Sequence, residues 1–260
     1  MKKPHGSIVG SMGGTLLSMV LGVSCSSGGG TPETGSPTEA AGSPSPAVQI
    51  LADCHEEMCE GDLHPGAYRS AFFEPTIDFE IASPGWTWRY AGSFAMIADE
   101  SHQDLYASDG IYFLRDPAIA SQDCGDEEAT ESVEPGVGSS VRQLVTWLEA
   151  APSLDVSEPV EVTVGGLDGM LLDLRLDPGW KETCFYSEPM PAAPLIINKA
   201  DIGGYNWAMF PGMSLRWYVL DSDDGVMVVD IEDSPGGASH DDLLSTGSQI
   251  VDSLTFSATS

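Results

Sequence analysis

One short acidic segment of the sequence has residue types that could bind a hard cation. Asp221, Asp223 and Asp224 lie close together and are followed by Gly225. An EF-hand calcium loop needs glycine at its sixth position and a bidentate glutamate at its twelfth. Here glycine is the fifth residue, and Glu232 is the twelfth only when the loop is counted from Asp221. We therefore expect a hairpin turn at 221–225 and keep a weak candidate metal site of Asp221, Asp223, Asp224 and Glu232.

The whole chain is acidic. It has 260 residues, with 40 Asp and Glu against 10 Lys and Arg, and a formal net charge of −30. A nucleic-acid partner is not expected, because a phosphate backbone requires clustered basic residues. Such a chain could attract divalent or organic cations, with a second group of carboxylates at Glu232, Asp233, Asp241 and Asp242. The alternative is a solvated acidic surface with no specific ligand.

Motifs for catalysis are missing from the sequence. No Gly-x-Ser-x-Gly segment marks a nucleophile, and Ser139 and Ser140 are better explained as the cap of a following helix. The Gly-Gly pairs at 165–166 and 203–204 lack the lysine of a phosphate-binding loop. The histidines lie in polar segments or near element starts, at His55, His64, His102 and His240. We expect no catalytic residues and no cofactor.

The first 25 residues have the pattern of an export signal. Two lysines follow Met1, and the most apolar stretch, 16–23, is too short to span a bilayer. Leu21-Gly22-Val23-Ser24-Cys25 resembles the lipobox of bacterial lipoproteins. The resemblance implies cleavage between Ser24 and Cys25 and a lipid on the Cys25 thiol, which would hold the chain on the extracytoplasmic side of a cell membrane. An ordinary cleaved signal with an incidental cysteine is the alternative.

The segment after Cys25 has the composition of a tether. Gly, Pro, Ser and Thr fill 17 of the 24 positions from 26 to 49, and none is aromatic. Such a segment cannot bury enough apolar surface to offset its ordering entropy. Its r.m.s. span is about 25–30 Å, from roughly 5–6 Å times the square root of its length. The sequence thus predicts a signal peptide at 1–24, a lipidated tether at 25–49 and a single acidic domain at 50–260.

Four cysteines follow the lipobox, and an even number in an exported chain favours disulfides. Cys54 and Cys59 are near neighbours, whereas Cys124 and Cys184 lie in two separate polar segments. We favour the pairs 54–59 and 124–184 among the three possible connectivities. Zinc bound by Cys54, Cys59 and the nearby histidines is the alternative, although the spacing matches no known finger.

Apolar periodicity predicts strands and two helices in the domain. Strands are expected at 77–81, 86–88, 94–98, 111–114, 160–164, 170–176, 195–197, 205–210, 215–220 and 226–231, and helices at 141–150 and 241–254. This order predicts the α+β class, with an antiparallel sheet backed by the two helices. Six aromatic residues alternate on these strands and are expected mostly in the core: Trp86, Trp88, Tyr205, Trp207, Trp217 and Tyr218. Aromatic residues facing outward would offer a stacking surface for sugars or another protein.

Three short motifs resemble those of exported lipoproteins. They are 79–86 with its Gly85-Trp86 step, the turn at 164–169, and the closing segment 250–256. They are similar to uncharacterised lipoproteins of Gram-positive bacteria and, more distantly, to the PsbP and LpqN type of α-β-α sandwich, over roughly 66–256. The resemblance implies a PsbP-like sandwich that binds or assembles without catalytic residues.

The sequence therefore predicts a lipid-anchored extracytoplasmic lipoprotein whose domain binds an unknown protein or small molecule. Two alternatives remain at this stage. One is a cation- or solute-binding lipoprotein, which an acidic cluster would favour. The other is a secreted hydrolase that uses carboxylates, which two carboxyl groups with perturbed titration in one pocket would favour.

Overall fold

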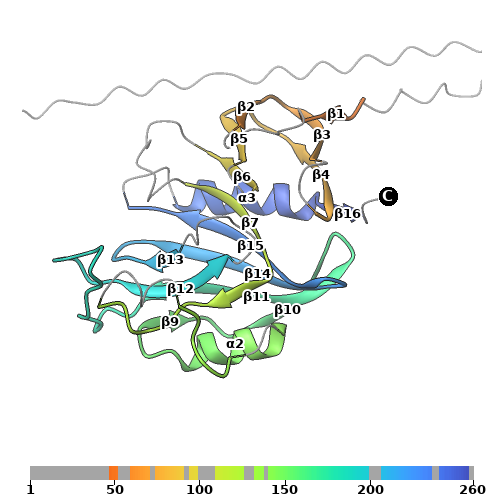
Figure 1. Cartoon of the computed structure of the whole chain (residues 1–260). Coiled ribbons are helices and arrows are strands. Elements are labelled where there is room, and N and C mark those ends of the chain that lie inside the picture. Colours follow the sequence, from red (N-terminus) through yellow and green to blue (C-terminus); the bar gives the residue numbers. More distant parts are fainter. Residues whose placement is uncertain are drawn as a thin grey trace, which may run out of the picture. The chain divides into compact units, whose positions relative to one another are not determined.

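A computed structural model describes residues 47–51, 59–70, 74–90, 94–98, 109–125, 132–137, 140–198, 206–235 and 240–257 (Figure 1). Residues 45–260 form one compact unit. Ser24, Cys25 and most of the predicted tether lie outside the described residues, so the signal peptide and the anchor stay predictions.

The largest sheet is antiparallel throughout. Its strands follow the order β10 (Val160–Val164), β11 (Leu167–Leu176), β14 (Ser214–Ser222), β15 (Gly225–Asp233), β7 (Gly110–Arg115), β6 (Phe94–Ile97), β5 (Trp86–Tyr90) and β2 (Cys59–Leu63), and β9 (Leu154–Val156) pairs with β11. The central pair, β14 and β15, is a hairpin in which Ser222 pairs with Gly225. The predicted turn at 221–225 is thus a two-residue connection between long strands.

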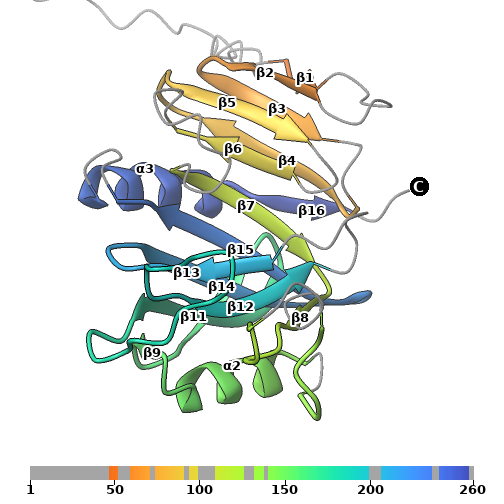
Figure 2. The same cartoon turned by 60° about the vertical axis from the view of Figure 1, so that its left-hand side comes forward.

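Two smaller sheets accompany the large one. The first has the order β1 (Gln49–Ile50), β3 (Gly66–Ser70), β4 (Thr76–Ile81) and β16 (Thr255–Ser257). The second has the order β13 (Asn206–Met209), β12 (Ala193–Asn198) and β8 (Pro117–Ile119). In both views β12 and β13 lie close to β14, whereas β3 and β4 lie beyond α3 and β7 (Figures 1 and 2).

The two helices of the described part lie on opposite sides of the large sheet. Helix α2 (Val141–Ala150) packs against β9, β11 and β14, and α3 (His240–Asp252) packs against β15, β7 and β4. The cap expected for α2 is present, because the Ser140 side chain accepts a hydrogen bond from the backbone N–H of Gln143. Figure 2 shows α2 and α3 separated by the strands of the sheet.

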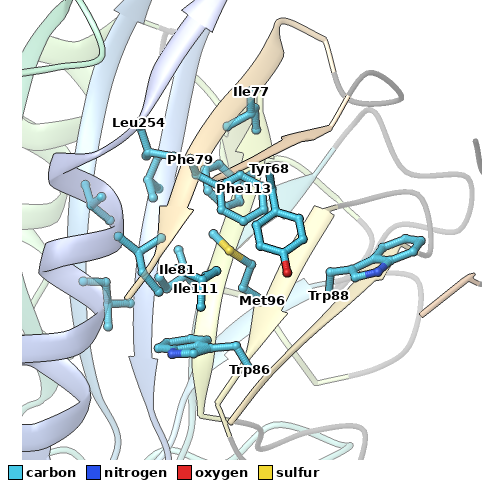
Figure 3. Close-up of a cluster of buried hydrophobic side chains, with 14 of the residues drawn as sticks. Tyr68, Ile77, Phe79, Ile81, Trp86, Trp88, Met96, Ile111, Phe113 and Leu254 are labelled. Carbon is cyan, nitrogen blue, oxygen red and sulfur yellow. The ribbon is translucent and has the colours of Figure 1, made fainter. Parts of the chain in front are cut away.

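Alternate residues of the central strands enter two separate hydrophobic cores. On β15, Met227, Val229 and Ile231 face the core that contains α3, β3 and β4. Val226 and Val228 face the core that contains α2, β8 and β12. Figure 3 shows the first core, in which aromatic and aliphatic side chains of β3 to β7 gather beside α3. Strands β14 and β15 are therefore buried on both faces.

The prediction of an α+β sheet backed by two helices is wrong, and the α-β-α sandwich implied by the resemblance is wrong with it. The described residues form a β-rich fold with several sheets. Each face of the large sheet carries one helix, and strands of a smaller sheet cover the rest. The physical reason is that alternation shows that one side of a strand is buried but not whether a helix or another strand covers it.

The individual elements were predicted better than their assembly. The helix expected at 141–150 is α2, and each strand expected between 77 and 231 corresponds to a strand of the structure. Strands β1, β2, β3, β8, β9 and β16 were missed. Several of these are only two or three residues long, too short to show a periodic pattern.

A disulfide joins two long connections next to the second core. Cys124 and Cys184 are bonded, with their Cα atoms 5.0 Å apart, and Cys184 is fully buried. This is one of the two pairs that the sequence favours. Cys59 is also disulfide-bonded. Cys54 lies outside the described residues, so the pairing of Cys54 with Cys59 stays a prediction.

Candidate functional site

The structure separates the carboxylates that the sequence grouped as a candidate metal site. Asp221, Asp223 and Asp224 are exposed at the β14–β15 turn, whereas Glu232 lies near the other end of β15. At roughly 3.3 Å per residue, the distance from the turn to Glu232 is about 20 Å. Asp241 and Asp242 are exposed in the first turn of α3. Among the described residues, no group of three or more His, Cys, Asp or Glu side chains could hold a metal ion.

Glu232 belongs to a different site, which the sequence did not predict. Asp230 and Glu232 are two residues apart on β15 and share the face that carries Val226 and Val228. Asp230 has no exposed surface, and the exposed fraction of Glu232 is 6%. Two carboxyl groups therefore lie side by side inside the protein.

Aromatic residues on the neighbouring strands surround Asp230. It pairs directly with Trp217 of β14 on one side and with Tyr112 of β7 on the other. Directly paired residues of antiparallel strands project to the same face, so both rings flank the carboxyl. Trp207 of β13 contacts Tyr112 edge to face, with ring centroids 5.9 Å apart. We call Tyr112, Trp207, Trp217, Asp230 and Glu232 the acid–aromatic cluster.

The two carboxyl groups differ in their hydrogen bonds. Glu232 accepts from the Ser234 hydroxyl at 3.3 Å and is also hydrogen-bonded by the Trp207 side chain. Asp109, just before β7, accepts from the backbone N–H of Ser234 at 2.9 Å and so fixes the end of β15. Within the described structure, neither carboxyl oxygen of Asp230 has a hydrogen-bond partner of acceptable geometry, and neither does the indole N–H of Trp217.

Burial changes the titration of both carboxyl groups. It raises the pKa of Asp230 well above its ordinary value. The charge of Glu232 raises it further, and hydrogen bonding by the Trp217 side chain lowers it. Burial also raises the pKa of Glu232 to about 8, against the opposing hydrogen bonds from Ser234 and Trp207, while the charge of Asp109 raises it. Both carboxyl groups therefore hold protons near neutral pH, since a charge without a counterion is costly in a protein interior.

The arrangement of the two carboxyl groups differs from that of a glycosidase. Glycosidase carboxyl groups stand on opposite sides of the scissile bond, whereas Asp230 and Glu232 are neighbours on one strand face. Ion pairs in the described structure join Arg69 to Asp78, Arg89 to Glu60, Arg115 to Glu74, and Arg216 to Asp173. In the described part of the chain, none of these pairs supplies a counterion to the acid–aromatic cluster.

The other predicted residues are dispersed. Cys59 is in β2, His64 follows that strand, and His240 begins α3. Cys54, His55, His102 and Tyr205 lie outside the described residues. Cys59 is disulfide-bonded, so its sulfur is not free to bind the zinc ion considered at 54–64. Trp86, Trp88, Trp217 and Tyr218 are core residues, as expected, and Trp207 is half-buried.

A hollow lies between β4, β5 and α3, and two hydroxyl groups on its wall are hydrogen-bonded within the protein. It is lined by residues that include Glu80, Trp86, Thr246 and Ser253. Ser253 accepts from the Glu80 backbone N–H and donates to the carbonyl of Ile250, and Thr246 donates to the carbonyl of Asp242. Because these groups have partners, this hollow gives less reason to expect a ligand than the acid–aromatic cluster does.

The sequence matches no protein-family model and no curated protein. No helix in the described part is long and apolar enough to cross a membrane. Functional inference therefore rests on the residues themselves.

Proposed function

We propose that this protein is a lipid-anchored extracytoplasmic binding protein whose domain takes a small ligand at the acid–aromatic cluster. The observation that carries the proposal is the carboxyl group of Asp230, which is fully buried and has both oxygens unpartnered within the described structure. Burying a polar group without a partner costs about 1–3 kcal/mol. Such a cost is commonly retained where a ligand supplies the missing partner.

The adjacent residues support the same reading. The N–H of Trp217 lies beside the carboxyl of Asp230 and lowers its pKa as a hydrogen-bond donor does, but the two groups form no hydrogen bond of good distance and angle. Tyr112 and Trp207 are only half-buried, and they provide aromatic surface on the side of the cluster nearer solvent. Small-molecule sites commonly combine aromatic walls with a few convergent polar groups.

A panel of solutes tests ligand binding. Thermal unfolding of the full chain in mild detergent would be measured with glucose, glycine, n-butylammonium and calcium. One of these is expected to raise the unfolding temperature saturably in the wild type and in the control variant Asp221→Asn, but not in Asp230→Asn. The proposal fails if no solute produces a shift or if the shift persists in Asp230→Asn.

The anchor is proposed from the lipobox pattern and the tether composition. Cys25→Ser is expected to move the protein from the membrane fraction to the medium, because it removes the thiol that would carry the lipid. Ser24→Ala keeps a small residue before the cysteine and is expected to stay in the membrane fraction. Retention of a processed Cys25→Ser chain on membranes would contradict the anchor.

A further inference from the structure

The charges of the residues around Asp230 indicate which class of ligand the acid–aromatic cluster could bind. Asp230 and Glu232 are buried, and none of the ion pairs of the described residues includes either of them. Three described titratable groups lie near Asp230: Glu232 on the same strand, Tyr112 on β7, and Asp109 just before β7. The neighbouring residues on β14 and β13, Trp217 and Trp207, do not titrate. Every one of these titratable groups is neutral or negative. A cation would favour ionisation of either carboxyl group and pair with the carboxylate that forms, whereas an anion would be repelled by it.

The aromatic residues distinguish an organic cation from a metal ion. Calcium and magnesium require about six or more oxygen ligands, and the described residues contain no group of three metal ligands. The faces of Trp and Tyr rings attract ammonium groups through the negative charge of their π systems. Trp207 and Tyr112 meet at 5.9 Å beside the two carboxyl groups, so this wall suits an organic cation.

The hydrogen-bond inventory specifies the kind of cation. Both oxygens of Asp230 lack a donor within the described structure. A primary ammonium group has N–H bonds that could donate to these oxygens, whereas a quaternary ammonium group has none. A neutral sugar could also donate hydrogen bonds, but it would not stabilise the ionised form of the carboxyl group as a cation does.

We propose that the acid–aromatic cluster binds a small primary ammonium ion, whose N–H groups donate to Asp230 and Glu232 and whose alkyl part packs on Tyr112 and Trp207. This inference rests on the proposed function and specifies its ligand class.

Binding would exchange a proton for the ammonium ion. The carboxylic acid of Asp230 loses its proton to solvent, and the resulting carboxylate pairs with the intact ammonium group, so charge and atoms balance. The affinity should therefore rise with pH while the cluster still holds protons. The limit is about tenfold per pH unit when one proton is released per ligand bound.

Isothermal titration calorimetry of the full chain in mild detergent tests this inference. The probes are n-butylammonium and n-butyltrimethylammonium, which share the alkyl chain and differ in N–H donors. We expect n-butylammonium to bind at least about tenfold more tightly, since a hydrogen bond to a charged group contributes roughly 1.5–3 kcal/mol. Titrations at pH 6.5 and 8.5, in buffers of different ionisation enthalpy, would measure the released proton.

Two variants test whether n-butylammonium binds at the acid–aromatic cluster. Asp230→Asn is expected to lower n-butylammonium affinity at least about tenfold by removing the charge-assisted partner. Asp221→Asn, at the exposed turn, is expected to leave it unchanged. Asp230→Asn also requires a circular dichroism spectrum like that of the wild type, so that loss of binding is not loss of folding.

Several results would overturn the inference. Equal affinity for the two probes, no proton release, or full affinity in Asp230→Asn would each contradict it. Binding of glucose or calcium at the cluster in place of n-butylammonium would leave the proposed function standing but replace the ligand class. Absence of binding by every solute would reject both.

Discussion

Asp230 and Trp217 lie directly opposite each other on β15 and β14, and both are fully buried. Within the described residues, neither the carboxyl group nor the indole N–H forms a hydrogen bond of good distance and angle, although the Trp217 side chain lowers the pKa of Asp230 as a donor does. Two central strands, which otherwise contribute apolar side chains to the second core, thus place two unsatisfied polar groups at one position. We therefore expect substitutions at Asp230 or Trp217 to change both the stability of the domain and its binding of a ligand.

Glu232→Gln should change the pH dependence of stability. The pKa of Glu232 is raised from 4.5 to about 8 by burial, so the folded state holds a proton that the unfolded state releases. Its favourable contribution is complete below about pH 4.5 and is lost as the pH rises to about 8, by up to roughly 1.4 kcal/mol per pH unit. Urea unfolding across this window should therefore show a shallower decline in the variant. Parallel curves for variant and wild type would contradict the buried, protonated Glu232.

Asp230→Asn should stabilise the unliganded protein at alkaline pH. The amide has nearly the shape of the carboxyl group but does not ionise, whereas burial and the neighbouring Glu232 oppose ionisation of Asp230. The variant's gain in free energy of unfolding over the wild type should be greater at pH 9 than at pH 5. Asp221→Asn, whose side chain is exposed at the hairpin turn, serves as the control and should show no such pH-dependent gain. The prediction is wrong if the difference in free energy of unfolding between Asp230→Asn and the wild type is the same at pH 5 and pH 9.

Removal of the Cys124–Cys184 disulfide should destabilise the domain. The bond closes a loop with a sequence separation of 60, and Cys184 is fully buried. Loss of such a cross-link costs about 2–5 kcal/mol, mainly through the entropy of the unfolded chain. Chemical unfolding of Cys124→Ala, Cys184→Ala and the double variant should show far less than additive losses, because either single change breaks the same bond. Additive losses would mean that the bond itself contributes little.

Gly165→Ala should destabilise the β10–β11 hairpin. Gly165 has a φ of +58°, and a Cβ there would lie 2.5 Å from the Phe256 ring. The left-handed conformation alone costs about 1–2 kcal/mol with a side chain, and the contact adds to it. Gly166→Ala is the matched control, since its φ is also positive, at +90°, but no atom lies within 4 Å of the added Cβ.

The same contact can be tested by a double-mutant cycle. Differential scanning calorimetry should show that Gly165→Ala costs less stability when Phe256 is already replaced by alanine, because the ring that meets the new Cβ is gone. If Gly165→Ala lowers stability equally with and without the Phe256 ring, the ring moves aside without loss of stability. The contact also brings together the turn at 164–169 and the closing segment 250–256, which are far apart in the sequence.

Local pattern alone determined many individual elements. Ser140 and the apolar spacing after it were sufficient to locate α2, and the acidic turn before Gly225 was sufficient to locate the β14–β15 hairpin. These features depend on neighbours in the sequence, through capping, periodicity and turn chemistry. The lipobox at Cys25 is likewise a local pattern, and the anchor that it predicts stays to be tested.

Tertiary structure decided the sheet assembly and the site. Val226 to Glu232 shows two acids among apolar residues in a strand, a signal of buried carboxyl groups that could have been noticed. The sequence instead suggested grouping Glu232 with the exposed acids of the turn. The site instead joins strands that are distant in the chain. Tyr112 of β7 pairs with Asp230, and Trp207 of β13 hydrogen-bonds Glu232 and contacts Tyr112. Such long-range contacts depend on which surfaces cover each strand, and alternation along a single strand carries no information about that choice.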